Sequence, residues 1–194
     1  MNKNRNIWIA VGVVSGLCLV ACVVAFFVLR QVGTQVSQAI KTNPADVQAV
    51  SDKIAKYDMP PGYKAQLSMS FVVYDMVMLA PSQSGSSSMI IMMMQFSGGG
   101  ANLDRQQMEQ QMQQASQQQG GQPGMQMKVV ETREETIRGE KVTVTVSEGT
   151  SQGITIRQWM TVFQGNGGPT VLMIQGSTSD WNDQLISNFI QSIR

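Results

Sequence analysis

The sequence predicts an α+β domain, an antiparallel sheet of about six strands flanked by helices, preceded by one transmembrane helix. Three observations lead to this prediction. Residues 7–29 form an apolar run without a charge. Strand-like segments follow one another across short turns, which indicates antiparallel pairing rather than a βαβ repeat. Helical periodicity is confined to residues 44–58, to residues 102–119 and to the C-terminal end.

The anchor is the clearest element of the sequence. Residues 7–29 are 23 consecutive uncharged residues, and about 20 are enough to cross the hydrocarbon core of a bilayer. Lys3 and Arg5 precede the run. Because basic residues favour the cytoplasmic side, we expect residues 1–6 in the cytoplasm and the rest of the chain outside it. The predicted location is a single-pass signal-anchor in the cell membrane, with the lipid bilayer as a partner.

Two other interpretations of this segment remain open. A cleaved signal peptide has a shorter apolar core, of about 7–15 residues. A lipoprotein signal would place the lipid on Cys22, because Leu19-Val20-Ala21-Cys22 resembles a lipobox. Residues 23–29 stay apolar, whereas lipoproteins usually turn polar after the modified cysteine. All three interpretations put the domain at a membrane or beyond it.

Residues 30–58 are expected to form a juxtamembrane stalk followed by a helix. Asn43 is a suitable N-cap, and Pro44 suits the first helical position. The apolar residues that follow have helical spacing and share one face, namely Val47, Val50, Ile54 and Tyr57. Residues 59–62 (MPPG) end the helix, and residues 59–194 are predicted to be the extracytoplasmic α+β domain.

The first half of the domain contains two expected strands, the first of which is interrupted. Residues 65–73 and 76–80 are apolar, and Tyr74-Asp75 between them predicts a bend or bulge. Residues 89–96 (MIIMMMQF) show no alternation, which predicts a strand buried on both faces. Serine-rich and glycine-rich loops follow these strands.

Residues 102–119 are rich in glutamine and methionine. The absence of β-branched residues favours a helix, with Asn102 as its cap and Met108, Met112 and Ala115 on one face. A disordered tract is the alternative, because this composition offers little apolar surface to bury.

The last third predicts four strands and a helix. The strands are residues 127–137, 141–148, 154–164 and 170–175, with turns at Arg138-Gly139-Glu140 and at residues 148–153. Ser179 is expected to cap the final helix. The apolar stripe of that helix comprises Trp181, Leu185, Ile186, Phe189, Ile190 and Ile193.

The order of elements in residues 60–194 resembles the PsbP-like fold. The resemblance rests on a strand–helix–strand step through residues 89–130 and on the turn at Ile137-Arg138-Gly139. It also rests on the apolar strand 171–174, on Trp181 at the start of a helix and on the ending FIQSIR. The family implies an antiparallel sheet covered by helices on both faces, and accessory or binding roles rather than catalysis. The same pattern is similar to uncharacterised bacterial envelope proteins with one N-terminal anchor, and it carries over no functional residue.

The composition excludes several kinds of site. The chain has no histidine, which removes the commonest general base and metal ligand. Both cysteines, Cys18 and Cys22, lie in the apolar run. Lys3, Arg5 and Arg30 account for three of the 14 basic residues, so eleven remain in residues 31–194 against 13 acidic ones. We therefore expect no nucleic-acid partner, because such proteins usually carry a basic stripe.

Methionine offers one candidate metal site. Met108 and Met112 are spaced M-x3-M, and Met125 and Met127 are spaced M-x-M. Thioethers are soft ligands that suit Cu(I). The competing interpretation is that methionine is an adaptable core filler, and that Met108 and Met112 face a sheet.

Charged residues give two weaker candidates. Glu131, Arg133, Glu134, Glu135, Arg138, Glu140 and Lys141 surround one predicted hairpin. We interpret them as a solvated face with cross-strand ion pairs, with an acid–base pair as the alternative. Asp75 is a single acid in an apolar run, expected to point to water at a bulge; burial would instead mark it as a site.

The predicted function is a membrane-anchored, non-enzymatic binding or accessory module of the cell envelope, with an unidentified protein or small ligand as its partner. The sequence predicts no catalytic residue and no cofactor. Copper binding through methionine clusters, or a lipoprotein of hydrolase type, is the alternative.

Overall fold

The computed structural model describes residues 40–83, 89–97, 107–108, 110 and 127–194. The chain divides into two compact units, Met1–Ile40 and Lys41–Arg194, and of the first only Ile40 is described. The predicted transmembrane helix and Cys22 therefore lie outside the described residues. No helix within the described part of the chain has both the length and the apolar character needed to span a membrane.

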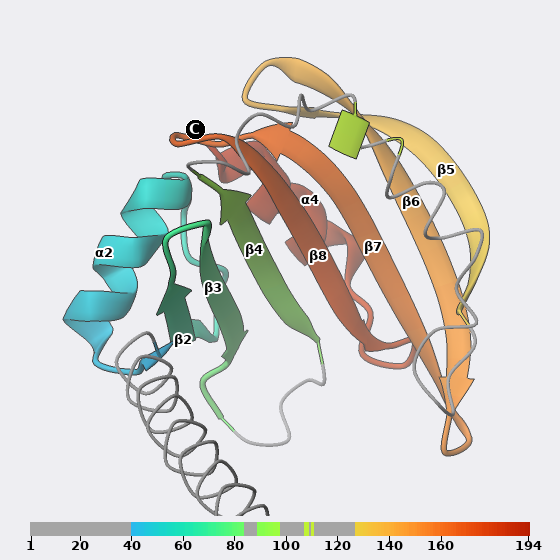
Figure 1. Cartoon of the computed structure of the whole chain (residues 1–194). Helices are drawn as coiled ribbons and strands as arrows, with labels where there is room; N and C mark the ends of the chain where they lie inside the picture. The colour runs from blue at the N-terminus through green and yellow to red at the C-terminus, as the bar shows by residue number, and fades with distance from the viewer. Residues whose placement is uncertain (1–39, 84–88, 98–106, 109, 111–126) are drawn as a thin grey trace, which may run out of the picture. The chain divides into compact units, whose positions relative to one another are not determined.

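The described residues form an α+β fold built on one antiparallel sheet, as the sequence predicts (Figure 1). Its elements are β1 (Ile40–Lys41), α2 (Pro44–Ile54), β2 (Tyr63–Ser70), β3 (Tyr74–Pro81), β4 (Ile90–Phe96), β5 (Met127–Ile137), β6 (Glu140–Ser151), β7 (Ile154–Gln164), β8 (Pro169–Ser177) and α4 (Asp183–Ser192). The strands are ordered β1-β2-β3-β4-β8-β7-β6-β5. The described residues thus contain eight strands, and the prediction of about six was too low because β1 has only two residues and one expected strand is a hairpin.

The segment 65–80 is a hairpin rather than one strand with a bulge at Tyr74-Asp75. β2 and β3 pair from Tyr63↔Pro81 to Ser70↔Asp75, and the Phe71 amide donates to the Tyr74 carbonyl at 2.8 Å. The register shift lies instead between Ala65 and Leu67 on β2. The prediction was wrong because the turn Phe71–Tyr74 contains no glycine, proline or asparagine to signal it.

β4 alternates between two environments. Ile91, Met93 and Gln95 are fully buried, whereas Ile90, Met92, Met94 and Phe96 are only half-buried. Successive residues of a strand point to opposite faces of a sheet. The prediction that this strand is buried on both faces is therefore corrected: one face enters the core, and the other, equally apolar, does not.

Both described helices belong to the core on one face of the sheet. α2 packs on β2, β3 and β4 and contributes Val47 and Ile54. α4 contributes Ile186, Phe189 and Ile190 to the same cluster, and its C-cap residue Ile193 also belongs to it. We name this side the core face and the opposite side the open face; Figure 1 is viewed from the open face, with α4 behind the strands.

The N-cap residue expected from the sequence is found in α2 but not in α4. Asn43 caps α2 as expected, and its side chain accepts from the Ala45 amide at 3.1 Å. α4 is capped by Asn182, whose Oδ1 accepts from the Leu185 amide at 2.9 Å. Ser179 is not its cap, because its hydroxyl lies 2.6 Å from the hydroxyl of Ser177. The stripe expected on this helix is confirmed, with Trp181 and Leu185 packed at its margin.

Two tight turns set the register of the long strands. Arg138-Gly139 joins β5 to β6, and Gln152-Gly153 joins β6 to β7. All four residues have positive φ, between 51° and 80°. Two-residue hairpin turns whose two residues both have positive φ match the twist of the strands they join, and glycine adopts this conformation without strain. The second turn is shorter than the sequence suggested, since β6 continues to Ser151.

Candidate functional site

The open face carries two rows of apolar side chains that run across the strands. In the first row, Met69 of β2 is opposite Met76 of β3, which is opposite Met94 of β4. Met94 is opposite Val171 of β8, and Val171 is opposite Val162 of β7. Directly opposed residues in antiparallel strands project from the same face, so these five side chains lie side by side.

The second row lies two residues further along each strand. Leu67 is opposite Met78, and Met78 is opposite Met92. Met92 is in turn opposite Met173, and Met173 is opposite Met160. The two rows bring seven methionines from five strands onto one face, and we name them the methionine face: Met69, Met76, Met78, Met92, Met94, Met160 and Met173.

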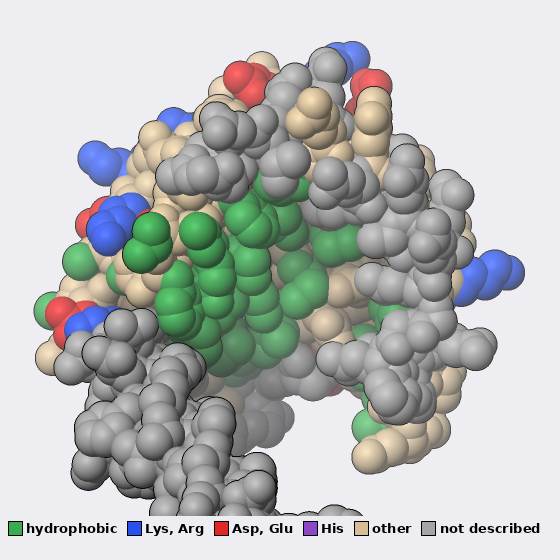
Figure 2. Space-filling view, viewed as in Figure 1, with side chains coloured by type: hydrophobic (Ala, Val, Ile, Leu, Met, Phe, Trp, Pro, Cys, Tyr) green, Lys and Arg blue, Asp and Glu red, His purple; other side chains and the backbone are tan. Residues whose placement is uncertain are grey.

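The methionine face is partly accessible. Met76 is 9% exposed, and the other six are half-buried. Figure 2 shows hydrophobic side chains gathered in the middle of this view, over β3, β4 and β8. Apolar side chains scattered singly on a surface are ordinary, whereas a contiguous, partly accessible group is a candidate binding surface.

The methionines of the run 89–94 divide between the two faces of the sheet. Within residues 89–94, Met89 and Met93 are buried in the core, and only Met92 and Met94 reach the open face. Met108 is described and buried, and Met127 is half-buried at the start of β5. Met112 and Met125 lie outside the described residues. The copper site predicted from Met108, Met112, Met125 and Met127 therefore stays a prediction.

Few polar groups border the methionine face. Lys64 of β2 is opposite Ala80 of β3, next to the second row, and is exposed. Gln175 of β8 and Gln158 of β7 face each other at the same level of the sheet, and the Gln158 amide lies 2.8 Å from the sulfur of Met173. Among the described residues of β2, β3, β4 and β8, Lys64 is the one charged side chain that the strand register puts on this face. The surface therefore suits an apolar ligand.

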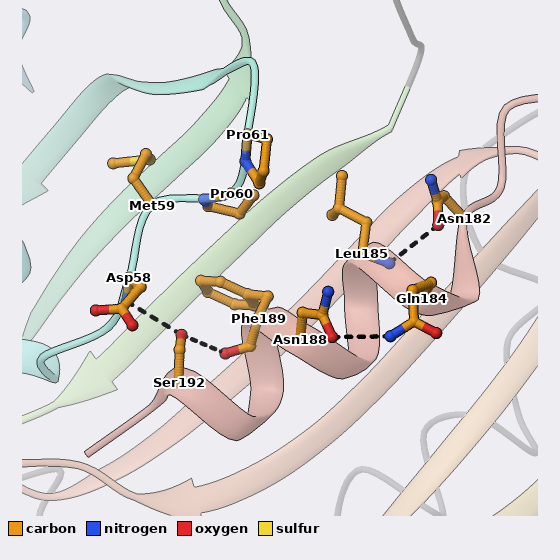
Figure 3. A pocket seen from close by; sticks show the side chains of 10 residues that line it. All are labelled: Asp58, Met59, Pro60, Pro61, Asn182, Gln184, Leu185, Asn188, Phe189 and Ser192. Atoms are coloured by element: carbon orange, nitrogen blue, oxygen red, sulfur yellow. Dashed lines mark hydrogen bonds between the residues drawn. The ribbon is translucent and has the colours of Figure 1, made fainter.

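A pocket lies between the segment Asp58–Pro61 and α4, away from the methionine face (Figure 3). Its volume is about 540 Å³. Met59, Pro60, Pro61, Leu185 and Phe189 form its apolar wall, and the side-chain amides of Asn182, Gln184 and Asn188 line the rest. All three amides make hydrogen bonds at the helix: Gln184 donates to Asn188 at 2.8 Å, and Asn182 caps α4.

The charged end of this pocket is neutralised. The Asp58 carboxylate accepts from the Arg194 guanidinium at 2.9 Å, which lowers the pKa of Asp58 and raises that of Arg194. Ser192 donates to the Phe189 carbonyl at 2.7 Å and accepts from the Asp58 amide at 3.1 Å. The Ser192 hydroxyl is held by two backbone partners, and Asp58, the one carboxylate among the lining residues, is paired with Arg194. The lining residues therefore show no activated nucleophile.

The charged hairpin is a solvated surface with ion pairs, as expected. Arg133 lies 3.4 Å from Glu131 and 3.1 Å from Glu135, and Lys141 lies 3.1 Å from Glu134 across the strands. These side chains are exposed or half-exposed, so each pair contributes little to stability. The described residues contain no group of three or more acidic, histidine or cysteine side chains that could hold a metal ion.

Asp75 is buried rather than solvated, which corrects the expectation that it points to water at a bulge. Its carboxylate accepts from the Ser70 hydroxyl at 2.5 Å and lies 3.9 Å from the Lys53 ammonium. Asp75 is opposite Gln95, whose side chain in turn accepts from the Gly167 amide at 2.7 Å. These contacts join the end of α2 to the sheet, and we assign Asp75 a structural role.

Sequence reasoning did not find the methionine face. Met69, Met76, Met78, Met160 and Met173 lie far apart along the chain, and only the strand register brings them together. One signal was present: β3 and β4 each carry methionine at alternate positions, 76 and 78, and 92 and 94.

Comparisons with known proteins assign no family to this chain. No family model matches it, and no curated protein matches it in sequence. Among solved structures, it is similar to the crystal structure of LpqN, a protein involved in cell envelope biogenesis of Mycobacterium tuberculosis. The two chains are 12% identical, with a TM-score of 0.33, over 71% of this chain and 76% of that one. A similarity this distant carries no argument about function, and the PsbP-like resemblance stays a prediction.

Proposed function

We propose that this protein is a membrane-anchored binding module, and that its methionine face binds the flexible apolar chain of a lipid. The observation that carries the proposal is the pair of apolar rows on the open face. Soluble domains normally place polar side chains on a sheet face that meets water. Here the face away from α2 and α4 is as apolar as the core face across β3, β4 and β8.

The choice of methionine favours a flexible ligand. β-Branched and aromatic residues are the usual side chains of strands, so seven methionines on one sheet face are unusual. Methionine has three rotatable side-chain bonds and a polarisable sulfur, and it can repack around ligands of different shape. An acyl chain adopts many conformations, and a surface of adjustable side chains can follow it.

The distance to the predicted anchor favours a lipid as the source of that chain. Ten residues, 30–39, separate the apolar run from Ile40. Fully extended, they span at most about 35 Å. If residues 7–29 cross the bilayer, β1 stays within that distance of its surface, where acyl chains are the most abundant apolar groups.

The expected affinity is modest. Burying about ten methylenes gives at most about 8 kcal/mol, at about 0.8 kcal/mol for each group. That limit corresponds to a dissociation constant of about 1 μM, and the cost of immobilising the chain weakens it further. Such a value fits reversible exchange with a nearby membrane rather than permanent retention.

Photo-crosslinking tests the proposal. The full chain would be reconstituted in nanodiscs that contain a phospholipid with a diazirine near the end of one acyl chain, and labelled peptides would be identified by mass spectrometry. We expect labels on residues 74–80 and 90–96, in addition to those in the anchor. The variant Met78→Gln with Met92→Gln should lose them, because it makes the second row polar while keeping side-chain length.

The matched control is Met59→Gln, since Met59 is 39% exposed and lines the pocket beside α4 rather than the methionine face. It should leave the labels on β3 and β4 unchanged. Labels confined to the anchor, or labels on these strands that persist in the double variant, would contradict the proposal.

A further inference from the structure

We propose that the centre of the methionine face is a binding site for a soft monovalent metal ion, Cu(I) or Ag(I). Its ligands are the thioether sulfurs of Met76 and Met78 on β3 and of Met92 and Met94 on β4. These four residues form a two-by-two block, in which Met76 is opposite Met94 and Met78 is opposite Met92.

The spacing of the block suits one ion. Opposed residues in antiparallel strands have Cβ atoms about 4.5–5.5 Å apart, and residues two apart on one strand are separated by about 7 Å. A methionine side chain places its sulfur two bonds beyond Cβ on rotatable bonds, so three or four sulfurs from the block can converge on one point above it. Met69 and Met173 flank the block in the two rows and offer further sulfurs.

The chemistry of the donors selects the metal. Thioethers are soft, neutral ligands that prefer Cu(I) to hard cations such as Mg²⁺ or Ca²⁺. Beyond residue 29 the chain contains no cysteine and no histidine, so methionine sulfur is its only soft ligand there. No carboxylate lies in either row of the open face, so hard cations have no anionic ligand at the block.

This inference goes beyond the binding of acyl chains and does not depend on it. Leucine keeps the apolar character of a methionine position but removes the sulfur. A variant with Met78→Leu and Met92→Leu should therefore lose the metal and keep the lipid. Metal and lipid would share one surface, so bound Ag(I) should also reduce lipid labelling of β3 and β4.

The experiment uses the full chain in nanodiscs, with methionine methyl groups labelled with ¹³C. Ag(I) serves as a redox-inert probe, and Cu(I) would be titrated without oxygen and in competition with a chromophoric Cu(I) chelator. We expect one equivalent to bind and to shift the methyl resonances of the four block residues. The resonances of Met89 and Met93, buried in the core, should not move.

The double variant Met78→Leu with Met92→Leu should bind at least tenfold more weakly, and the control Met59→Leu should bind like the unmodified protein. Unchanged affinity in the double variant would overturn the proposal. So would shifts confined to methionines outside the block. If the double variant fails to fold, the methyl shifts of the unmodified protein decide the question. The diazirine lipid is applied to the same leucine variant to separate the two proposals. Labels that persist on β3 and β4 support lipid binding whatever the metal titration shows, and loss of these labels would count against lipid binding alone.

Discussion

Neighbouring methionines on β4 should differ sharply in their effect on stability. Met93 is fully buried on the core face, opposite Val77 of β3 and Leu172 of β8. Met92 is half-buried on the open face, opposite Met78 and Met173. The replacements Met93→Ala and Met92→Ala remove the same atoms from adjacent positions of one strand, so each serves as the control for the other.

The structure sets the expected magnitudes. Removing a fully buried methionine side chain leaves a cavity and costs about 2–5 kcal/mol. At position 92 the side chain already contacts water and no closed cavity forms, so only part of the transfer term is lost, about 1 kcal/mol. We therefore expect the free energy of unfolding to fall at least twice as much for Met93→Ala as for Met92→Ala.

Urea unfolding of the full chain in detergent micelles, followed by far-UV circular dichroism, measures both values. Equal losses would show that the two faces of β4 are equally packed. A larger loss at position 92 would show that the register of β4 is shifted by one residue, because such a shift exchanges the two faces. Either result would refute the assignment of a core face and an open face.

Three further predictions concern single groups. In the variant Arg194→Gln, NMR titration should show the pKa of Asp58 rising towards its ordinary value, because the hydrogen bond and the charge of Arg194 lower that pKa in the folded protein. The pair stabilises the fold at neutral pH, and this contribution is lost as the pH falls through the lowered pKa of Asp58. Burial raises the pKa of Tyr57, against the opposing hydrogen bond from Ser51, so ultraviolet titration should show its phenol ionising above pH 10, and stability should fall as the pH rises through that value. Gly176→Ala should lower the free energy of unfolding by about 1–3 kcal/mol, and with it the urea midpoint, because a Cβ there would lie 2.8 Å from the backbone of Met89. An unchanged midpoint would mean that Met89 and β8 are further apart than described.

Local patterns in the sequence were enough to predict the fold class and most of the C-terminal half. The alternation of Val142, Val144 and Val146 with threonine predicts β6, and Gly139 predicts the turn before it. Asn43 followed by Pro44 predicts the start of α2 correctly because capping depends on neighbouring residues only. The final helix was more ambiguous: Ser179 and Asn182 are both good caps, and only the folded chain engages Ser179 with Ser177.

The environment of Asp75 could not be predicted, because it depends on residues from other elements. A carboxylate in an apolar run is expected to face water. Its burial is possible because Ser70 of the neighbouring strand donates to it and Lys53 approaches from α2. The hairpin that brings Ser70 opposite Asp75 was itself not predicted.

The methionine face was missed for a related reason. The run 89–96 has one composition on both faces, so the sequence predicted one environment for both. The two faces differ in their surroundings: Met93 belongs to the core cluster to which α2 and α4 contribute, whereas Met92 lies on the opposite side of the sheet. The spacing of methionines along the chain could not predict the methionine face, because its members are neighbours across strands.

The most direct test of lipid binding compares the methionines of the two faces in one spectrum. The full chain, with ¹³C-labelled methionine methyl groups, would be reconstituted in nanodiscs whose lipids carry a paramagnetic label near the end of one acyl chain. If the open face binds acyl chains, the methyl resonances of Met78 and Met92 broaden, whereas those of Met89 and Met93 stay sharp. Equal broadening of all four, or none at Met78 and Met92, would contradict lipid binding at the methionine face.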